Sequence, residues 1–147
     1  MEYSVQAALA QAHDGKIDDW VQSYLRQGPR ANLALADGLL GQRRWWVGPI
    51  QVPIWEPVRV CGPEPGLEYP VPLAQWDATT RELADGFTDL ESVPPLITEY
   101  RFGRLSLRDG NHRLRAFELK GWTTCWVLVW YNTEREFLTD PYPGLDQ

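Results

Sequence analysis

No segment limits the possible folds of this chain more than Thr123–Tyr131, which is apolar on both of its alternating sides. A strand that is buried on both faces lies inside a sheet whose two faces are covered by other elements. The sequence therefore predicts an inner strand of a mixed β-sheet flanked by helices, in a protein of the α+β class. The two sides of the strand are Cys125, Val127 and Val129, and Trp126, Leu128 and Trp130.

Residues 1–45 predict a helical N-terminal extension. A first helix capped by Ser4 and a second helix ended by Gly28-Pro29 both repeat apolar residues at helical spacing. A third helix is expected over residues 30–40. The apolar positions are Val5, Ala8, Leu9 and Ala12 in the first helix, and Ile17, Trp20, Val21, Tyr24 and Leu25 in the second.

Residues 46–76 are expected to form a long proline-rich loop, because residues 49–72 hold seven of the twelve prolines. Proline excludes regular helix and central strands, so only short edge strands such as Ile50–Ile54 or Pro57–Val60 are expected. Long irregular segments in compact domains are often functional. The loop either covers a site or wraps the structure, and composition leaves both readings open.

Residues 77–133 are expected to form the core of a single domain that spans residues 1–147. The pattern predicts a short helix over 79–86, strands over 95–102 and 104–107, and a helix over Asn111–Lys120 that ends at Gly121. The segment 140–147 is too rich in turn residues to be assigned.

The charge distribution favours a small anionic ligand. A net charge of −6 argues against non-specific nucleic-acid binding, which depends on surplus lysine and arginine. Five of the twelve arginines nevertheless fall within residues 101–115, and the rigid fork of arginine suits phosphate and carboxylate oxygens. The alternative is that some of the first three line a solvated strand face. The five are Arg101, Arg104, Arg108, Arg113 and Arg115.

The remaining composition indicates a cytoplasmic protein without a membrane partner. The N-terminus lacks the basic and apolar regions of a signal peptide, and no apolar run reaches membrane-spanning length. Two cysteines cannot form a disulfide framework; Cys125 is expected to be an inert buried thiol, and nothing marks Cys61 as reactive. Most of the eight tryptophans are expected to belong to the core.

The run Asp109-Gly110-Asn111-His112-Arg113 follows a predicted strand and begins a predicted helix. A helix start has free N–H groups and the positive end of the helix dipole, so it attracts anions. Arg113 and Arg115 oppose that dipole, and a bound phosphate would compensate for the conflict. Two internal alternatives remain open, namely an Asp109–Arg113 ion pair and an Arg115–Glu118 ion pair.

The run from Leu83 to Val129 resembles the ParB/sulfiredoxin-like superfamily, which includes the ParB-like nucleases and ParB N-terminal-like domains. The shared pattern is a helix, a strand opened by Pro-Leu, a hairpin, an Asp-Gly-x-His-Arg or Gly-Glu-Arg-Arg motif at a helix start, and a final strand. The elements that match it are Pro95-Leu96, Asp109-Gly110-Asn111-His112-Arg113, Arg115-Ala116, Gly121 and Trp126–Trp130.

The resemblance implies a site for the phosphates of a nucleoside triphosphate, ATP or CTP, accompanied by Mg²⁺. By matching position, Gly110 would let the backbone approach the phosphate, and Asn111, His112 and Arg113 would bind its oxygens. Asp109 would cap the turn or hold the metal ion. Arg115, in the same first turn, completes the predicted phosphate-binding set.

Departures from the family narrow the expected activity. Sulfiredoxins carry a catalytic cysteine where this chain has Asn111, so sulfinic-acid reduction is not expected. The motif is closest to that of the free-serine kinases, which transfer a phosphoryl group. Glu82, Asp85 and Glu99 are the carboxylates near the motif, and none matches the family pattern of a general base. No carboxylates are spaced to hold two metal ions.

Three functions follow from the sequence. The first is a nucleotide-binding domain that hydrolyses the nucleotide or transfers its phosphoryl group to a small-molecule acceptor. The second is a non-catalytic, nucleotide-responsive module that contacts a protein partner, or a DNA-associated ParB-like protein, although the acidic charge disfavours nucleic acid. The third is a domain without a ligand, whose arginine cluster is structural.

Overall fold

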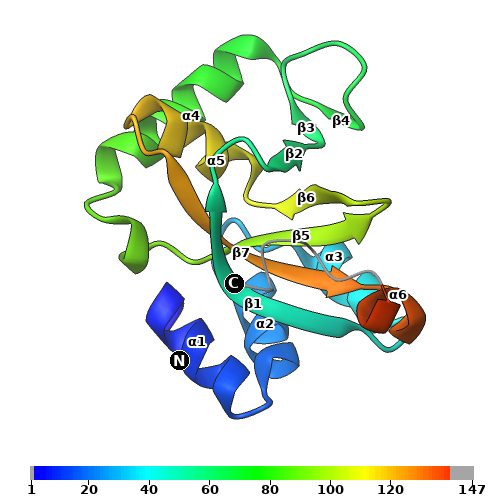
Figure 1. Ribbon diagram of the computed structural model, residues 1–147. Coiled ribbons are helices and arrows are strands. Elements are labelled where there is room, and N and C mark those ends of the chain that lie inside the picture. Colours follow the sequence, from blue (N-terminus) through cyan, green and yellow to red (C-terminus); the bar gives the residue numbers. More distant parts are fainter. Residues whose placement is uncertain (1, 140–147) are drawn as a thin grey trace.

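The computed structural model describes residues 2–139 and has an α+β architecture built on a five-stranded mixed sheet (Figure 1). The strands lie in the order β1-β7-β5-β6-β2. β7 pairs antiparallel with β1 and parallel with β5, and β6 pairs antiparallel with β5 and parallel with β2. The strands are β1 (Trp45–Pro53), β2 (Pro57–Arg59), β5 (Leu96–Arg101), β6 (Arg104–Asp109) and β7 (Thr124–Tyr131).

The inner strand predicted from the sequence is confirmed as β7. It lies between β1 and β5, and Cys125, Val127 and Leu128 have no solvent exposure. Burial raises the pKa of the Cys125 thiol to about 12, which agrees with the expectation of an inert buried cysteine.

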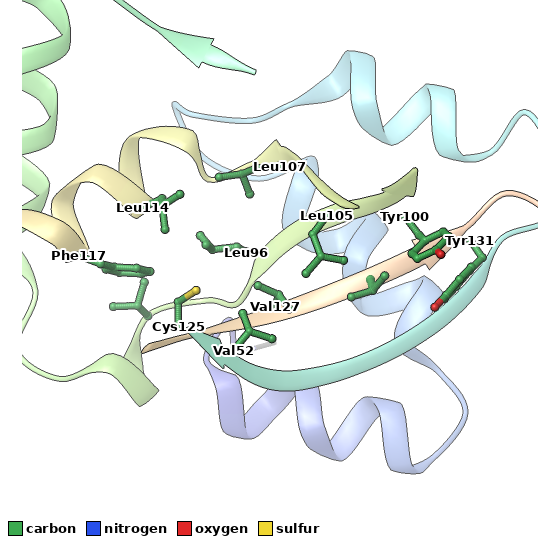
Figure 2. Close-up of a cluster of buried hydrophobic side chains, with 12 residues drawn as sticks. Val52, Leu96, Tyr100, Leu105, Leu107, Leu114, Phe117, Cys125, Val127 and Tyr131 are labelled. Atoms are coloured by element: carbon green, nitrogen blue, oxygen red, sulfur yellow. The ribbon is translucent and has the colours of Figure 1, made fainter. Parts of the chain in front are cut away.

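One face of the sheet packs against α5 (Asn111–Leu119) and forms an apolar core (Figure 2). Leu114 and Phe117 of α5 lie over Leu96 and Cys125 of the strands. Beside α5 runs α4 (Leu73–Gly86), whose buried side chains are Trp76, Thr80 and Ala84. Helix α4 begins six residues before the predicted helix over 79–86, because Thr80 interrupts the apolar pattern while Trp76 and Ala84 still anchor the helix.

The opposite face packs against three N-terminal helices. The helices themselves were predicted from the sequence. The side chain of the N-cap Ser4 accepts a hydrogen bond from the N–H of Ala7 at 3.2 Å. Trp20, Val21 and Leu25 pack with Ile97 and Leu128 of the sheet. The third helix is shorter than the expected segment 30–40. The helices are α1 (Val5–His13), α2 (Ile17–Leu25) and α3 (Leu33–Leu39).

The proline-rich segment is more ordered than its composition indicated. β1 extends over nine residues, although the sequence predicted only Ile50–Ile54, and it adapts to its prolines through a register shift between Val47 and Ile50. Both β1 and β2 lie at edges of the sheet, as the prolines predicted. The segment also forms a small parallel ribbon of β3 (Cys61–Gly62) and β4 (Tyr69–Pro70).

The remaining elements lie next to the Asp109–Arg113 motif or close to the end of the described residues. The β5–β6 hairpin and the start of α5 at Asn111 agree with the prediction. Two short helices were not predicted, the 3₁₀ helix η1 (Leu90–Ser92) and α6 (Glu134–Thr139). The turn-rich segment 140–147 lies outside the described residues. Within residues 2–139, no helix has the length and apolar character needed to cross a membrane.

Candidate functional site

A cavity of about 650 Å³ lies over the β5–β6 hairpin, on the side of the sheet that carries α1–α3. Its walls come from α3, the β3–β4 ribbon, the hairpin and the start of α5. Side chains two residues apart on a strand point to the same face, so Glu99 and Arg101 share the face of the buried Ile97. The cavity thus occupies the polar part of a face whose other part is apolar.

The floor of the cavity is a network of charged and amide side chains. Glu99 accepts a hydrogen bond of 2.7 Å from the Asn132 amide, and its carboxylate lies 3.4 Å from Nε of Arg108 and 3.7 Å from Nε of Arg101. Arg108 also pairs with Glu68, which precedes β4. Arg108 therefore joins the sheet to the ribbon, while Arg101 keeps a half-exposed guanidinium at the cavity.

The start of α5 opens into the same cavity. Gly110 has φ of 108° and is the N-cap, so it supplies no side-chain acceptor for the first N–H groups of the helix. A Cβ atom at Gly110 would lie 2.5 Å from Leu96 and 2.7 Å from the Arg113 guanidinium. Glycine is therefore required here by the backbone conformation and by close packing. Asp109, Gly110, Asn111 and His112 all line the cavity.

The side chain of Asn111 holds the ribbon against the sheet. Its Oδ1 accepts hydrogen bonds from the N–H groups of Val60 at 2.9 Å and Cys61 at 3.2 Å, and its Nδ2 donates to the carbonyl of Leu107. The side chain is buried, with 7% of the residue exposed. Only the backbone of Asn111 is therefore available to a ligand in this structure.

Arg113 is bonded inside the protein and does not line the cavity. Its guanidinium donates to the carbonyl of Pro94 at 2.6 Å and to Oδ2 of Asp109 at 3.0 Å, and it stacks over the ring of Tyr24. The internal Asp109–Arg113 pair, the alternative indicated by the sequence, is present. The other carboxylate oxygen of Asp109 accepts from the amide of Asn32, the N-cap of α3.

Arg115 also lies outside the cavity. It forms an exposed ion pair with Glu118 at 3.7 Å, as the second alternative predicted. The predicted phosphate-binding set is therefore divided: residues 109–112 line the cavity, although the side chains of Asp109 and Asn111 have internal partners, whereas Arg113 and Arg115 do not line it.

His112 presents an imidazole to the cavity from the edge of an aromatic stack. Its ring lies 4.5 Å from the ring of Trp76, and the guanidinium of Arg59 lies over the same indole at 4.8 Å. Burial lowers the pKa of His112, and the positive charges of Arg30 and Arg59 lower it further. An anion bound beside His112 would offset the positive charges of Arg30 and Arg59.

Of the three candidate general bases, only Glu99 lines the cavity. Glu82 and Asp85 are exposed on α4, outside the residues that form it. Sequence reasoning missed Arg44, Glu68 and the α3 wall, because they reach the cavity only through the fold. The sequence did contain one indication of the cavity floor. Glu99 and Arg101 are two residues apart on a predicted strand, so their charged side chains are expected on the same face of the sheet.

The described residues offer no preformed metal site. Within residues 2–139, no group of three or more histidine, cysteine, aspartate or glutamate side chains is placed to hold a metal ion. Both carboxylate oxygens of Asp109 already accept hydrogen bonds from Asn32 and Arg113. This arrangement disfavours Asp109 as a metal ligand, so Mg²⁺ bound here would be held chiefly through nucleotide phosphate oxygens and water.

Comparisons of this chain with family models, curated proteins and solved structures return no significant match.

Proposed function

We propose that this protein binds a nucleotide, with a phosphate group at the start of α5. The observation that carries the proposal is that the uncapped N-terminus of α5, at Gly110–His112, opens into the cavity of about 650 Å³. Free backbone N–H groups and the positive end of a helix dipole bind phosphate. The resemblance of the surrounding strand–turn–helix to the ParB/sulfiredoxin-like superfamily supports the same assignment.

The size and lining of the cavity support a ligand larger than phosphate alone. Cavities of about 300–1,000 Å³ hold cofactors and small molecules, usually between apolar walls with a few polar groups. Here Leu35 and Leu39 of α3 form an apolar wall, and Trp130 and Tyr69 add aromatic surface. A flat base and a sugar fit such a wall better than a bare anion does.

In this proposal Arg101 and Arg108 supply the positive charge for the phosphates that was expected from Arg113 and Arg115. Both line the cavity, and Arg101 has a half-exposed guanidinium with only a long contact to Glu99. Arg101 contacts the outer phosphates in the proposed complex, and the N–H groups of α5 contact the phosphate nearest to His112. Arg108, which pairs with Glu68 and Glu99, adds positive charge at the floor of the cavity.

Thermal unfolding with ATP, ADP, CTP and GTP, each with Mg²⁺, tests the proposal. A ligand at about 100 times its Kd stabilises the folded state by about 2.7 kcal/mol, which raises the Tm by roughly 5–10 °C for a chain of this size. The variant Ala34→Trp places an indole in the cavity from an exposed position of α3. The matched control Ala74→Trp makes the same change at an exposed position of α4.

Nucleotide should stabilise the parent and Ala34→Trp should lose that stabilisation, whereas Ala74→Trp should keep it. Equal stabilisation of all three proteins would place the nucleotide elsewhere, and the absence of any shift with every nucleotide would overturn the proposal. Phosphate release by the parent, measured in the same samples, separates an enzyme from a binding module. Turnover would favour Glu99, the one of the three candidate bases that lines the cavity, as the base to replace first.

A further inference from the structure

The tip of the β5–β6 hairpin displays an aromatic side chain at an unfavourable backbone position. Phe102 and Gly103 form a two-residue turn between the paired residues Arg101 and Arg104, and both have positive φ, 51° and 81°. Turns of this kind favour Asn-Gly, because large L side chains rarely adopt positive φ. Phe102 is nevertheless 93% exposed, so burial in the core does not explain the choice of residue.

A groove of about 380 Å³ runs from this tip towards the edge of the sheet. It is lined by Val58, Phe102 and Ser106, with Arg101 and Arg104 at its sides. Val58 is 45% exposed on β2, the last strand of the sheet. Arg104 has no ion pair within the described residues. The groove therefore combines an exposed apolar floor with positive charge, on a protein whose net charge is −6.

We propose that this groove is a docking site for an acidic segment of a protein partner, with an apolar side chain of that segment inserted between Phe102 and Val58. Charge complementarity selects the occupant, because the two arginines favour carboxylates beside the apolar anchor. A protein segment is favoured over nucleic acid, since two arginines on an acidic protein neutralise too few phosphates for stable binding.

The docking site goes beyond the proposed function and does not depend on it. Phe102 and Arg104 do not line the nucleotide cavity, whereas Arg101 lines both and is therefore left unchanged in the test. Failure of nucleotide binding and failure of docking can thus be observed separately in the same protein.

Fluorescence anisotropy with a labelled acidic peptide, Asp-Glu-Phe-Leu-Asp-Glu, tests the docking site on the full chain. The parent should bind the peptide at micromolar concentration, more weakly at about 500 mM than at about 50 mM NaCl, and should not bind Lys-Lys-Phe-Leu-Lys-Lys. Phe102→Asn and Arg104→Glu should each weaken binding at least about tenfold, as expected for an aromatic anchor and a charged contact. Matched controls are Trp55→Ser, at another exposed aromatic residue, and Arg81→Glu, at an exposed arginine of α4.

The variant Phe102→Asn also separates docking from folding. Asn tolerates positive φ and forms the preferred Asn-Gly turn, so this variant should unfold at the same or a higher urea concentration than the parent. Equal peptide binding by the parent and both variants would overturn the proposal, as would the absence of binding by the parent. Tighter binding of single-stranded oligothymidylate than of the acidic peptide would replace the protein partner with nucleic acid.

Discussion

The two faces of the central sheet differ in how completely they are covered. The face that packs against α5 is mostly apolar, from Val52 and Cys125 near the helix to the stacked pair Tyr100 and Tyr131 at the other end of the sheet (Figure 2). Its buried polar side chain, Thr98, donates a hydrogen bond to the carbonyl of Leu128. The opposite face is apolar only where α1–α3 cover it, at residues such as Ile97 and Leu128. Over the hairpin the same face turns polar and holds the cavity.

This difference shows how one set of strands serves stability and ligand binding at the same time. Strand alternation sends Leu105 and Leu107 of β6 into the closed core, while Arg108 and Glu99 meet on the open face. Charges are tolerated there because they pair with one another: the largely buried Arg108 and Glu99 are joined by Arg101 and Glu68, whose side chains are about half exposed. The closed face thus supplies stability, and the open face leaves room for a ligand.

The largest expected effect is on the closed face. Phe117→Ala should lower the free energy of unfolding by about 3–5 kcal/mol, because it opens a cavity in a core where this ring is 1% exposed. Urea unfolding measures the change. Glu118→Ala, at the exposed neighbour on α5, should alter stability by less than about 0.5 kcal/mol. A loss below about 1 kcal/mol for Phe117→Ala would show that this face is loosely packed.

Arg113→Ala should lower the free energy of unfolding by about 2–3 kcal/mol, since it removes the cation that pairs with Asp109 and the donor to Oδ2 of Asp109 and to the carbonyl of Pro94. The matched change Arg115→Ala removes only an exposed ion pair and should cost less than about 0.5 kcal/mol. Urea unfolding and nucleotide titration of both variants distinguish a residue that stabilises the fold from one that binds the ligand. If Arg113→Ala kept full stability but lost nucleotide binding, Arg113 would belong to the cavity after all.

The smallest expected effect is a pH dependence of nucleotide binding. In the free protein the pKa of His112 lies below its ordinary value of 6.5, and a phosphate beside the ring would raise it. Binding then takes up a proton, so affinity should increase as the pH falls from about 8 to about 6, by at most about tenfold per pH unit. Calorimetric titration measures this slope. His112→Gln should flatten it, and a parent whose affinity rose with pH would contradict the assignment.

The lowered pKa of His112 has a second consequence, for stability without ligand. A histidine with a lowered pKa binds protons more readily in the unfolded chain. Its contribution to stability is complete above pH 6.5 and is lost as the pH falls through its pKa in the folded state. The difference between the urea midpoints of the parent and of His112→Gln should therefore stay constant above pH 6.5. It should change only as the pH falls below that value, where the parent loses stability.

Local patterns were sufficient to predict much of the fold. The inner strand β7, the hairpin and the start of α5 at Asn111 follow from apolar alternation and from a glycine turn. The length of β1 and the early start of α4 did not follow, because proline and threonine weaken the local signal while tertiary packing supplies the missing stability. The cavity itself was beyond prediction, since α3, the ribbon and the hairpin are far apart along the chain.

The sequence by itself determined that a helix begins at residue 111 with uncapped N–H groups and a histidine in its first turn, because a glycine turn and helical spacing act over a few residues. Only the tertiary structure decided which cations face the cavity. The guanidinium of Arg113 donates to Asp109 and to the carbonyl of Pro94, away from the cavity. Arg101 and Arg108 line the cavity because their positions on β5 and β6 place their side chains on the open face of the sheet. The reason is physical: an arginine bonds to whichever acceptors the fold brings within reach, and those acceptors come from segments distant in the sequence.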